Sequence, residues 1–353
     1  MKTKAILLIA LMLGFVGASA QKIDKGELKE LQAFLSQPSE NNTTNAAALN
    51  ITDLSSPATW EGVTIENGHV TSIEWKDKHL AGALNLSNFK RLTKLNITRN
   101  AITELNLAND VALYRVDAQR NKINSVDLDG CTGLTVLNLY RNRITDLNVQ
   151  KAPFIQTVNI SNNRLVELDV ANSATLKTLN CQGNHLEVLN VQYCTNLKNL
   201  YCGYNKLTGL TLVGVENLSN LNIDDNEISS ILISNLPSLA TFVCSDNNMT
   251  TLGIRKCPTL IDLVCSYNNL TSLQVVDCPH LLFVDCSYND LTSLDLSNLT
   301  FLQRLLCNNN QLSMLDVSFD QALTYINCRS NMITDLRTIG CKSLSMVACQ
   351  WFY

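Results

Sequence analysis

An unbroken repeat of 21 residues constrains this chain more than any other feature of its sequence. A leucine or isoleucine returns at that interval from Leu92 to Leu344 without an insertion. Each unit has the pattern L-x-x-L-x-C/I-x-x-N-x-L-x-x-L-x-L, which is clear between Leu260 and Leu273. A unit this short cannot bury its apolar residues alone, so neighbouring units must stack into a solenoid.

The alternation within the unit predicts the shape of each coil. In the L-x-x-L-x-C segment the fourth and sixth residues point inward, and the third and fifth point outward, as in a β-strand. Stacked strands then form one parallel sheet that advances about 4.8 Å per coil, or roughly 60 Å in all. The second half of the unit, such as Leu291 to Leu296, is also strand-like. So few residues leave no room for a long helix behind the sheet.

This pattern resembles the signature of the leucine-rich-repeat family, L-x-x-L-x-L-x-x-N/C-x-L. The short period is similar to that of the 21-residue class of bacterial secreted and surface proteins, of which the internalins are examples. The resemblance covers residues 71–353, about 13 repeats. It implies an α/β-class solenoid that is mostly β: a right-handed curved superhelix with a parallel concave sheet and short extended or 3₁₀ segments on the convex side. Residues 70–80 depart from the pattern, because they form a degenerate unit one residue out of step.

An asparagine occupies the ninth position of each unit. Every turn of the chain leaves backbone groups unpaired, and a buried asparagine can satisfy them with two donors and an acceptor. We therefore interpret this row as a structural ladder and not as a ligand site, and the resemblance implies the same. Its members are Asn100, Asn121, Asn142, Asn163, Asn184, Asn205, Asn226, Asn247, Asn268, Asn289, Asn310 and Asn331.

The thirteen cysteines fall into two positions of the repeat. Eight lie at the sixth position and five at a second position, and both positions accept leucine, isoleucine or valine in other units. Free cysteine packs well in such small apolar spaces. Disulfides between stacked coils remain an alternative on distance, although parallel side chains fit the required torsion poorly. The sequence therefore predicts free thiols, and no C-x-x-C or histidine grouping indicates a metal.

The first seventy residues lie outside the repeat. Lys2 and Lys4 precede a short apolar run, and Ala18-Ser-Ala20 offers a cleavage site, so residues 1–20 are predicted to be a signal peptide. Residues 21–70 are predicted to form an N-terminal cap of a helix and a hairpin, because a capping box opens at Asp24 and Asn67-Gly68 favours a tight turn. A cap is needed to cover the first coil. No matching C-terminal cap is evident, and the final aromatic residues either fold over the open end or contact another chain.

Charge excludes some partners. Without the signal peptide the chain has 25 basic and 31 acidic residues, a net charge of −6, because the two lysines are removed from 27. This balance argues against nucleic acid and anionic membranes. No stretch is long enough to be a transmembrane segment. The chain is thus expected to be exported and to be secreted, periplasmic or attached at the cell surface.

Outward residues of the later units predict an interaction surface. Aromatic and aliphatic side chains gather at the third, fifth and eighth positions, and large exposed apolar patches usually mark interaction sites. We predict that those of the late units form a contiguous patch on the concave sheet, with Tyr201 and Tyr204 nearby. A covering segment, or strand propensity alone, would be the structural alternative. The patch consists of Tyr201, Tyr204, Val243, Val264, Tyr267, Phe283, Tyr288, Leu306 and Tyr325.

Charged residues form two further zones. The early units carry a basic strip that could bind an anion, although a solvated column of charges is the alternative. The strip consists of Lys94, Arg99, Arg115, Arg120 and Arg141. The middle units carry Asp224, Asp225, Asp246 and Asp262, for which calcium is conceivable, but the spacing matches no known calcium loop.

These observations favour a recognition protein that binds a protein or peptide through the concave sheet. A glycan-binding module and a structural or assembly subunit are the alternatives, because outward asparagines suit sugar hydroxyls and the C-terminal end is uncapped. An enzyme is not expected, since no G-x-S-x-G, H-E-x-x-H or phosphate loop occurs and the four histidines are scattered. We expect no cofactor, metal or nucleic acid. The oligomeric state and the identity of the partner are not encoded in the pattern.

Overall fold

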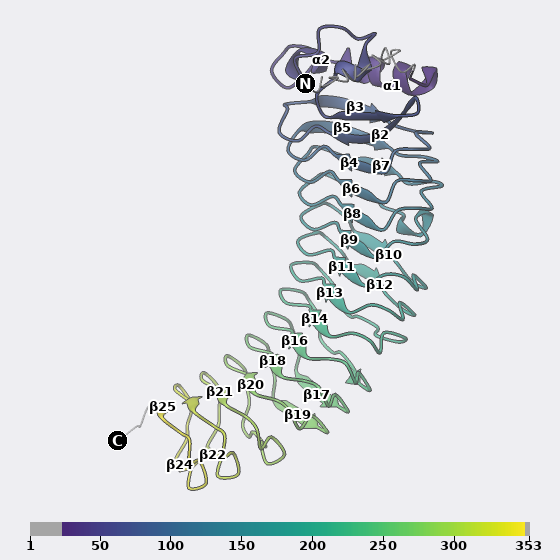
Figure 1. Ribbon diagram of the computed structural model, residues 1–353. Helices are drawn as coiled ribbons and strands as arrows, with labels where there is room; N and C mark the ends of the chain where they lie inside the picture. The colour runs from purple at the N-terminus through teal and green to yellow at the C-terminus, as the bar shows by residue number, and fades with distance from the viewer. Residues whose placement is uncertain (1–22, 350–353) are drawn as a thin grey trace, which may run out of the picture.

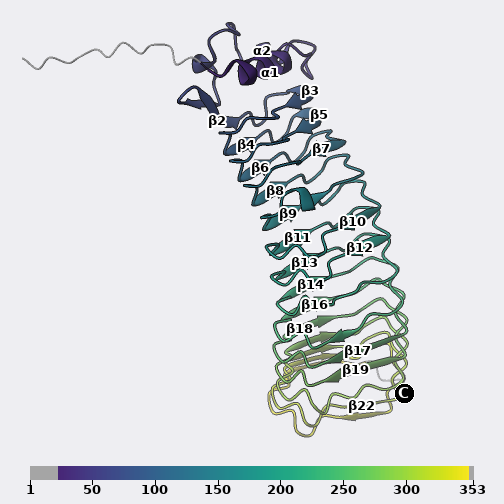
Figure 2. The same cartoon turned by 90° about the vertical axis from the view of Figure 1, so that its right-hand side faces the viewer.

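The computed structural model describes residues 23–349. The predicted signal peptide and the final aromatic residues lie outside this range. Within it the chain winds into a stack of coils that bends along its length (Figure 1), and a view turned by 90° shows the coils edge-on, one beneath another (Figure 2). The structure confirms the predicted fold class.

One large sheet lines the solenoid. Its 15 strands are parallel, except that the first two form an antiparallel hairpin. In spatial order they are β1 (Val63–Glu66), β2 (His69–Glu74), β4 (Lys94–Asn96), β6 (Arg115–Asp117), β8 (Val136–Asn138), β9 (Thr157–Asn159), β11 (Thr178–Asn180), β13 (Asn199–Tyr201), β14 (Asn220–Asn222), β16 (Thr241–Val243), β18 (Asp262–Val264), β20 (Phe283–Asp285), β21 (Arg304–Leu306), β23 (Tyr325–Asn327) and β25 (Met346–Ala348).

The strands of the opposite face form four short sheets. They are β3 (Ala81–Asn85), β5 (Ala101–Asn106) and β7 (Ser125–Asp127); β10 (Glu167–Asp169) and β12 (Val188–Asn190); β15 (Ile233–Ser234), β17 (Thr251–Arg255) and β19 (Ser272–Val276); and β22 (Met314–Asp316) and β24 (Asp335–Arg337). A 3₁₀ turn, η2 (Val149–Lys151), lies in one of the intervals. Figure 1 shows the large sheet on the inner side of the bend and strands such as β17 and β24 on the outer side.

Strand register follows the repeat. Neighbouring strands of the large sheet pair at an offset of 21 residues, as Leu200 does with Leu221. The pairing of Ile73 with Leu95 has an offset of 22, which confirms the phase shift predicted for the degenerate first unit. In the units up to Cys328 the fourth and sixth residues are buried and form the core, while most residues at the third and fifth positions are partly exposed.

The N-terminal end is covered by helical segments. Helix α1 (Lys25–Leu35) begins where the Asp24 carboxylate accepts the N–H groups of Gly26 and Glu27. It is followed by α2 (Asn45–Ala48) and the 3₁₀ turn η1 (Pro57–Thr59). Phe34 of α1 stacks on Trp75 with ring centroids 5.9 Å apart. This packing keeps the first coil of the core away from solvent.

The C-terminal end is different. In β25 the side chain of Val347, which occupies a core position of the repeat, is 44% exposed, and Met346 is 59% exposed. No further strand covers β25 within the described residues. The core is therefore closed at the N-terminal end and open at the last described coil.

Candidate functional site

The asparagine ladder fixes the turn that follows each strand of the large sheet. The Asn205 Nδ2 donates to the carbonyls of Cys181 and Cys202, at 3.1 and 3.0 Å, and its Oδ1 accepts the N–H of Leu186 at 3.0 Å. Each of the other ladder asparagines likewise bonds its own coil and the preceding one. Because both amide atoms are used, the ladder is part of the scaffold.

The same turn holds the eighth residue of each unit up to Ser330 in the left-handed region. Its φ lies between 49° and 58° in the non-glycine cases, a conformation that costs an L-residue about 1 kcal/mol. Asparagine and glycine suit this conformation, yet three units place a tyrosine there. The non-glycine residues are Arg99, Arg120, Arg141, Asn162, Tyr204, Asp225, Asp246, Tyr267, Tyr288, Asn309 and Ser330.

The predicted aromatic patch is on the surface. Tyr204, Tyr267 and Tyr288 are 53%, 50% and 44% exposed, and the strand members of the patch are half-buried. Tyr267 and Tyr288 lie in adjacent coils and stack with their ring centroids 4.2 Å apart and their planes 10° apart. The stack is a preformed pair of aromatic faces beside the inner sheet.

An arginine divides the strand part of the patch. Arg304 pairs in register with Phe283 on one side and Tyr325 on the other. Its guanidinium lies over both rings, 5.4 and 5.7 Å from their centroids. Stacking on ring faces leaves the N–H groups at the edge of a guanidinium available. This part of the surface therefore offers aromatic area and a cation together.

A polar residue interrupts the strand part of the predicted patch. Asp285 lies in register between Val264 and Leu306, and its carboxylate accepts the N–H and the hydroxyl of Ser287, at 3.0 and 2.6 Å. Tyr201 and Tyr204 lie on the coil of β13, which the coil of β14 separates from β16. Polar residues also occur at the third position of these coils, where Thr241 and Asp262 are in register.

The predicted basic strip is divided in a different way. Lys94 is ion-paired with Glu74, Arg99 lies 3.7 Å from Asp77, and Arg115 lies 2.6 Å from Asp117. Arg120 and Arg141 form no ion pair among residues 23–349. Of the predicted strip, Arg120 and Arg141 therefore keep a positive charge that is available to an anion.

Sequence reasoning missed two more arginines beside them. Arg143 and Arg164 lie at the tenth position, immediately after ladder asparagines, and both are exposed. Tyr140, which lies between Arg120 and Arg141, was also missed. A reading of every outward position of the turn, and not only the eighth, would have found them.

The acidic zone of the middle coils contains one poorly solvated carboxyl group. Burial raises the pKa of Asp224, and its Oδ1 has no hydrogen-bond partner within the described part of the chain. Across residues 23–349 no three histidine, cysteine, aspartate or glutamate side chains come together in a group that could hold a metal ion.

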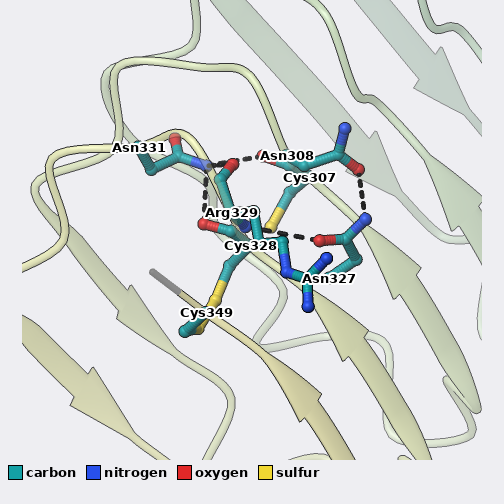
Figure 3. Close-up of a disulfide and its surroundings, with 7 residues drawn as sticks. All are labelled: Cys307, Asn308, Asn327, Cys328, Arg329, Asn331 and Cys349. Atoms are coloured by element: carbon teal, nitrogen blue, oxygen red, sulfur yellow. Dashed lines mark hydrogen bonds between the residues drawn. A yellow bond between two sulfur atoms is a disulfide. The ribbon is translucent and has the colours of Figure 1, made fainter. Parts of the chain in front are cut away.

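The cysteines are mostly free thiols. Eleven are unpaired, and burial raises the pKa of the Cys181 thiol to about 12, so this thiol stays protonated. Cys328 and Cys349 form a disulfide between the last two coils, beside the ladder bonds of Asn331 (Figure 3). The prediction of free thiols is therefore wrong for this pair, since stacked sixth positions bring two Cα atoms within 5.1 Å.

Two buried aspartates occupy the second cysteine position in other coils. The Asp110 carboxylate accepts the Phe89 N–H at 2.7 Å with one oxygen, while its other oxygen and both oxygens of Asp320 lack partners in the described range. Burial raises the pKa of Asp110 to about 8 and that of Asp320 to about 7. These groups were not foreseen, because other units place cysteine, valine or leucine at this position.

Known structures share the fold, while sequence comparisons find no relative. Neither a protein-family model nor a curated protein matches the chain. YopM from Yersinia enterocolitica superposes with a TM-score of 0.62 at 25% identity, over 74% of this chain and 55% of that one. YopM from Yersinia pestis, described as a leucine-rich effector protein, gives 0.59 at 21% identity over 74% and 78%.

A third solved structure, PEPR1–AtPEP1, has a TM-score of 0.60 at 20% identity and covers 91% of this chain and 54% of that one. This chain matches 55% of the Yersinia enterocolitica YopM chain and thus spans about half of its length. Among residues 23–349, no helix has both the length and the apolar character needed to cross a membrane.

Proposed function

We propose that this chain, a leucine-rich-repeat solenoid of 21-residue coils, binds a protein or a peptide on the inner sheet of its later coils. The observation that carries the proposal is the pair Tyr267 and Tyr288, stacked 4.2 Å apart on exposed left-handed turns. A tyrosine in this conformation costs stability that an asparagine would save. The presence of a tyrosine at this position in two adjacent coils therefore favours a role in binding and not in folding.

The adjoining strands supply the rest of the surface. Phe283 and Tyr325 enclose the guanidinium of Arg304, and no acidic side chain in residues 23–349 pairs with it. Tyrosine and arginine are the residues most enriched at the energetic centres of protein interfaces. We expect the partner to bring an apolar side chain to the tyrosine stack and a carboxylate to Arg304.

Neighbouring structures supply the fold on which this proposal is built. The PEPR1–AtPEP1 structure is a complex on the same kind of solenoid, and YopM from Yersinia pestis is described as an effector. Both likenesses show the fold alone. The chemistry of the partner is therefore inferred from the residues of this chain. We further propose that the chain is exported and non-enzymatic, on the basis of Lys2, Lys4 and the apolar run that follows, and of the lack of a catalytic motif in the sequence.

The test uses peptides selected on the immobilised protein from a random display library. Replacing Tyr267 and Tyr288 by asparagine should weaken the selected peptides by at least about tenfold, the effect of losing about 1.4 kcal/mol. Asparagine keeps the turn, so the variant should remain folded. Titration calorimetry measures the affinity, and circular dichroism checks the fold.

Tyr193→Asn is the matched control. Tyr193 is 53% exposed with a φ of 60°, but it lies in a turn far along its coil from the inner sheet. Its replacement should leave binding unchanged. Equal affinity in the double variant and the parent protein would show that the peptides bind elsewhere.

A further inference from the structure

Three consecutive coils of the early solenoid present four arginines, which we name the arginine strip. Arg120, Arg141, Arg143 and Arg164 are all exposed, and none forms an ion pair within residues 23–349. Successive coils advance by about 4.8 Å, so the positive charges are close enough to repel one another. An external anion would relieve this repulsion.

Tyr140 orients two members of the strip. The guanidinium groups of Arg120 and Arg141 lie 6.0 and 5.5 Å from the centroid of its ring. A guanidinium stacked on a ring uses its face and keeps its in-plane N–H donors free. Both groups are thus held in place with their hydrogen-bonding edges unoccupied.

The outward amides next to the strip also present donors. Asn138 Oδ1 accepts the N–H of Tyr140 at 3.3 Å, and Asn159 Oδ1 accepts the N–H and hydroxyl of Ser161 at 3.2 and 2.6 Å. These bonds fix which end of each amide faces the backbone. The Nδ2 groups of both asparagines, which lie in register on β8 and β9, therefore face outward.

Acceptors in this region are already occupied. The Asp117 carboxylate takes two bonds from Arg115, at 2.6 and 3.0 Å. The carbonyls of Asn138, Tyr140 and Ser161 each accept a backbone N–H from the preceding coil. The surface thus combines positive charge with N–H donors, while these carbonyl and carboxylate acceptors are engaged within the chain.

From this arrangement we infer that the arginine strip binds an acidic polysaccharide through its carboxylate or sulfate groups. Guanidinium groups recognise both oxyanions with paired hydrogen bonds. A polysaccharide that carries an anion on each repeating unit matches cations repeated from coil to coil. A peptide fits less well, because the carbonyls and the carboxylate named above are not free to accept its backbone N–H groups. The site is separate from the tyrosine stack and does not depend on the proposed function.

The test measures binding of four polymers by biolayer interferometry at low salt: polygalacturonate, dextran sulfate, neutral dextran and poly-glutamate. We expect one of the two anionic polysaccharides to bind, and the better one identifies carboxylate or sulfate as the recognised group. Changing all four arginines to glutamine should weaken it about thirtyfold, since each exposed ion pair contributes a factor of about two to three. Added salt should weaken binding to the parent protein.

A matched control removes the same charge elsewhere. Lys177, Lys198, Lys206 and Arg255 are exposed, and their replacement by glutamine should lower the affinity by less than about threefold. The inference is overturned if neither anionic polysaccharide binds, if poly-glutamate binds as tightly as the better of them, or if the control loses as much affinity as the strip variant. Thermal unfolding verifies that both variants fold.

Discussion

At the scale of single residues, the molecule tolerates acidic groups where its repeat calls for apolar ones. Asp110 is fully buried at a position that holds Cys131 in the next coil, and one of its oxygens lacks a hydrogen-bond partner within the described residues. An ionised carboxylate in such a place is poorly solvated, so the group holds its proton. The consequence is a pH dependence of stability that the repeat alone does not suggest.

Stability should fall as the pH rises from about 4 to 8. The folded-state pKa of Asp110 is raised to about 8, above its ordinary value of 3.8. Between these values the unfolded chain has released a proton that the folded chain still holds, so each pH unit costs up to about 1.4 kcal/mol. Asp110→Asn keeps an acceptor for the Phe89 N–H and removes the ionisation. Urea unfolding gives the free energy of unfolding of both proteins. The value of the variant minus that of the parent should be larger at pH 8 than at pH 5.

Asp146→Asn is the control for this experiment, because Asp146 is exposed. Its effect should be the same at both pH values. Asp320, whose pKa is raised to about 7, remains in both proteins and contributes equally to each. If Asp110→Asn and the parent differ by the same amount at pH 5 and pH 8, Asp110 does not titrate as a buried group.

Residue-level prediction from sequence succeeded where a position has one dominant environment. The ladder position of Asn205 and the outward position of Tyr267 both follow from the period and the strand alternation. It failed where the outcome depends on a neighbour in the next coil. The pairing of Lys94 with Glu74 of the preceding coil follows from side-chain geometry that the alternation does not contain.

At the scale of elements, the two faces of the solenoid are unequal. The large sheet continues through every coil, whereas the outer strands stop and restart. The sequence predicted strand-like segments on both faces, but not these interruptions. One interruption separates β12 from β15 at the coil that contains Gly209, and glycine weakens a strand because it has more conformational freedom to lose.

Gly209→Ala should therefore stabilise the chain by about 0.5–1 kcal/mol. A Cβ atom added at Gly209 meets no atom within 4 Å, and the gain comes from restricting the unfolded chain. Gly214→Ala in the same coil is the matched control. Its φ is 75°, and the added Cβ would lie 2.7 Å from the Tyr193 ring, so it should destabilise. Thermal unfolding of the two variants measures both effects. A loss of stability in Gly209→Ala would contradict the prediction.

At the scale of the whole molecule, the chain is a linear stack in which each coil depends on its neighbours. Stability in such an array is a sum of coil and interface terms, so an end coil with one neighbour is the first to open. The helices cover the first coil, while Val347 in the last described coil is 44% exposed. The period predicts the stack but not how its last coil is fastened, because that depends on the oxidation of one cysteine pair out of many equivalent ones.

The disulfide of Cys328 and Cys349 joins the last described coil to the one before it. Alkylation in denaturant should therefore modify eleven thiols per chain, and thirteen after reduction, as counted by mass spectrometry.

Reduction should also speed amide exchange in residues 341–349, whose backbone bonds reach only to the preceding coil, and leave the coil of β14 unchanged because it has a neighbour on each side. Cys349→Ser should reproduce the fast exchange without reductant, and Cys131→Ser, which removes a free buried thiol, should not. Thirteen reactive thiols in the unreduced protein would show that nothing covalent holds the open end, and its stability would then rest on packing and the Asn331 ladder bonds alone.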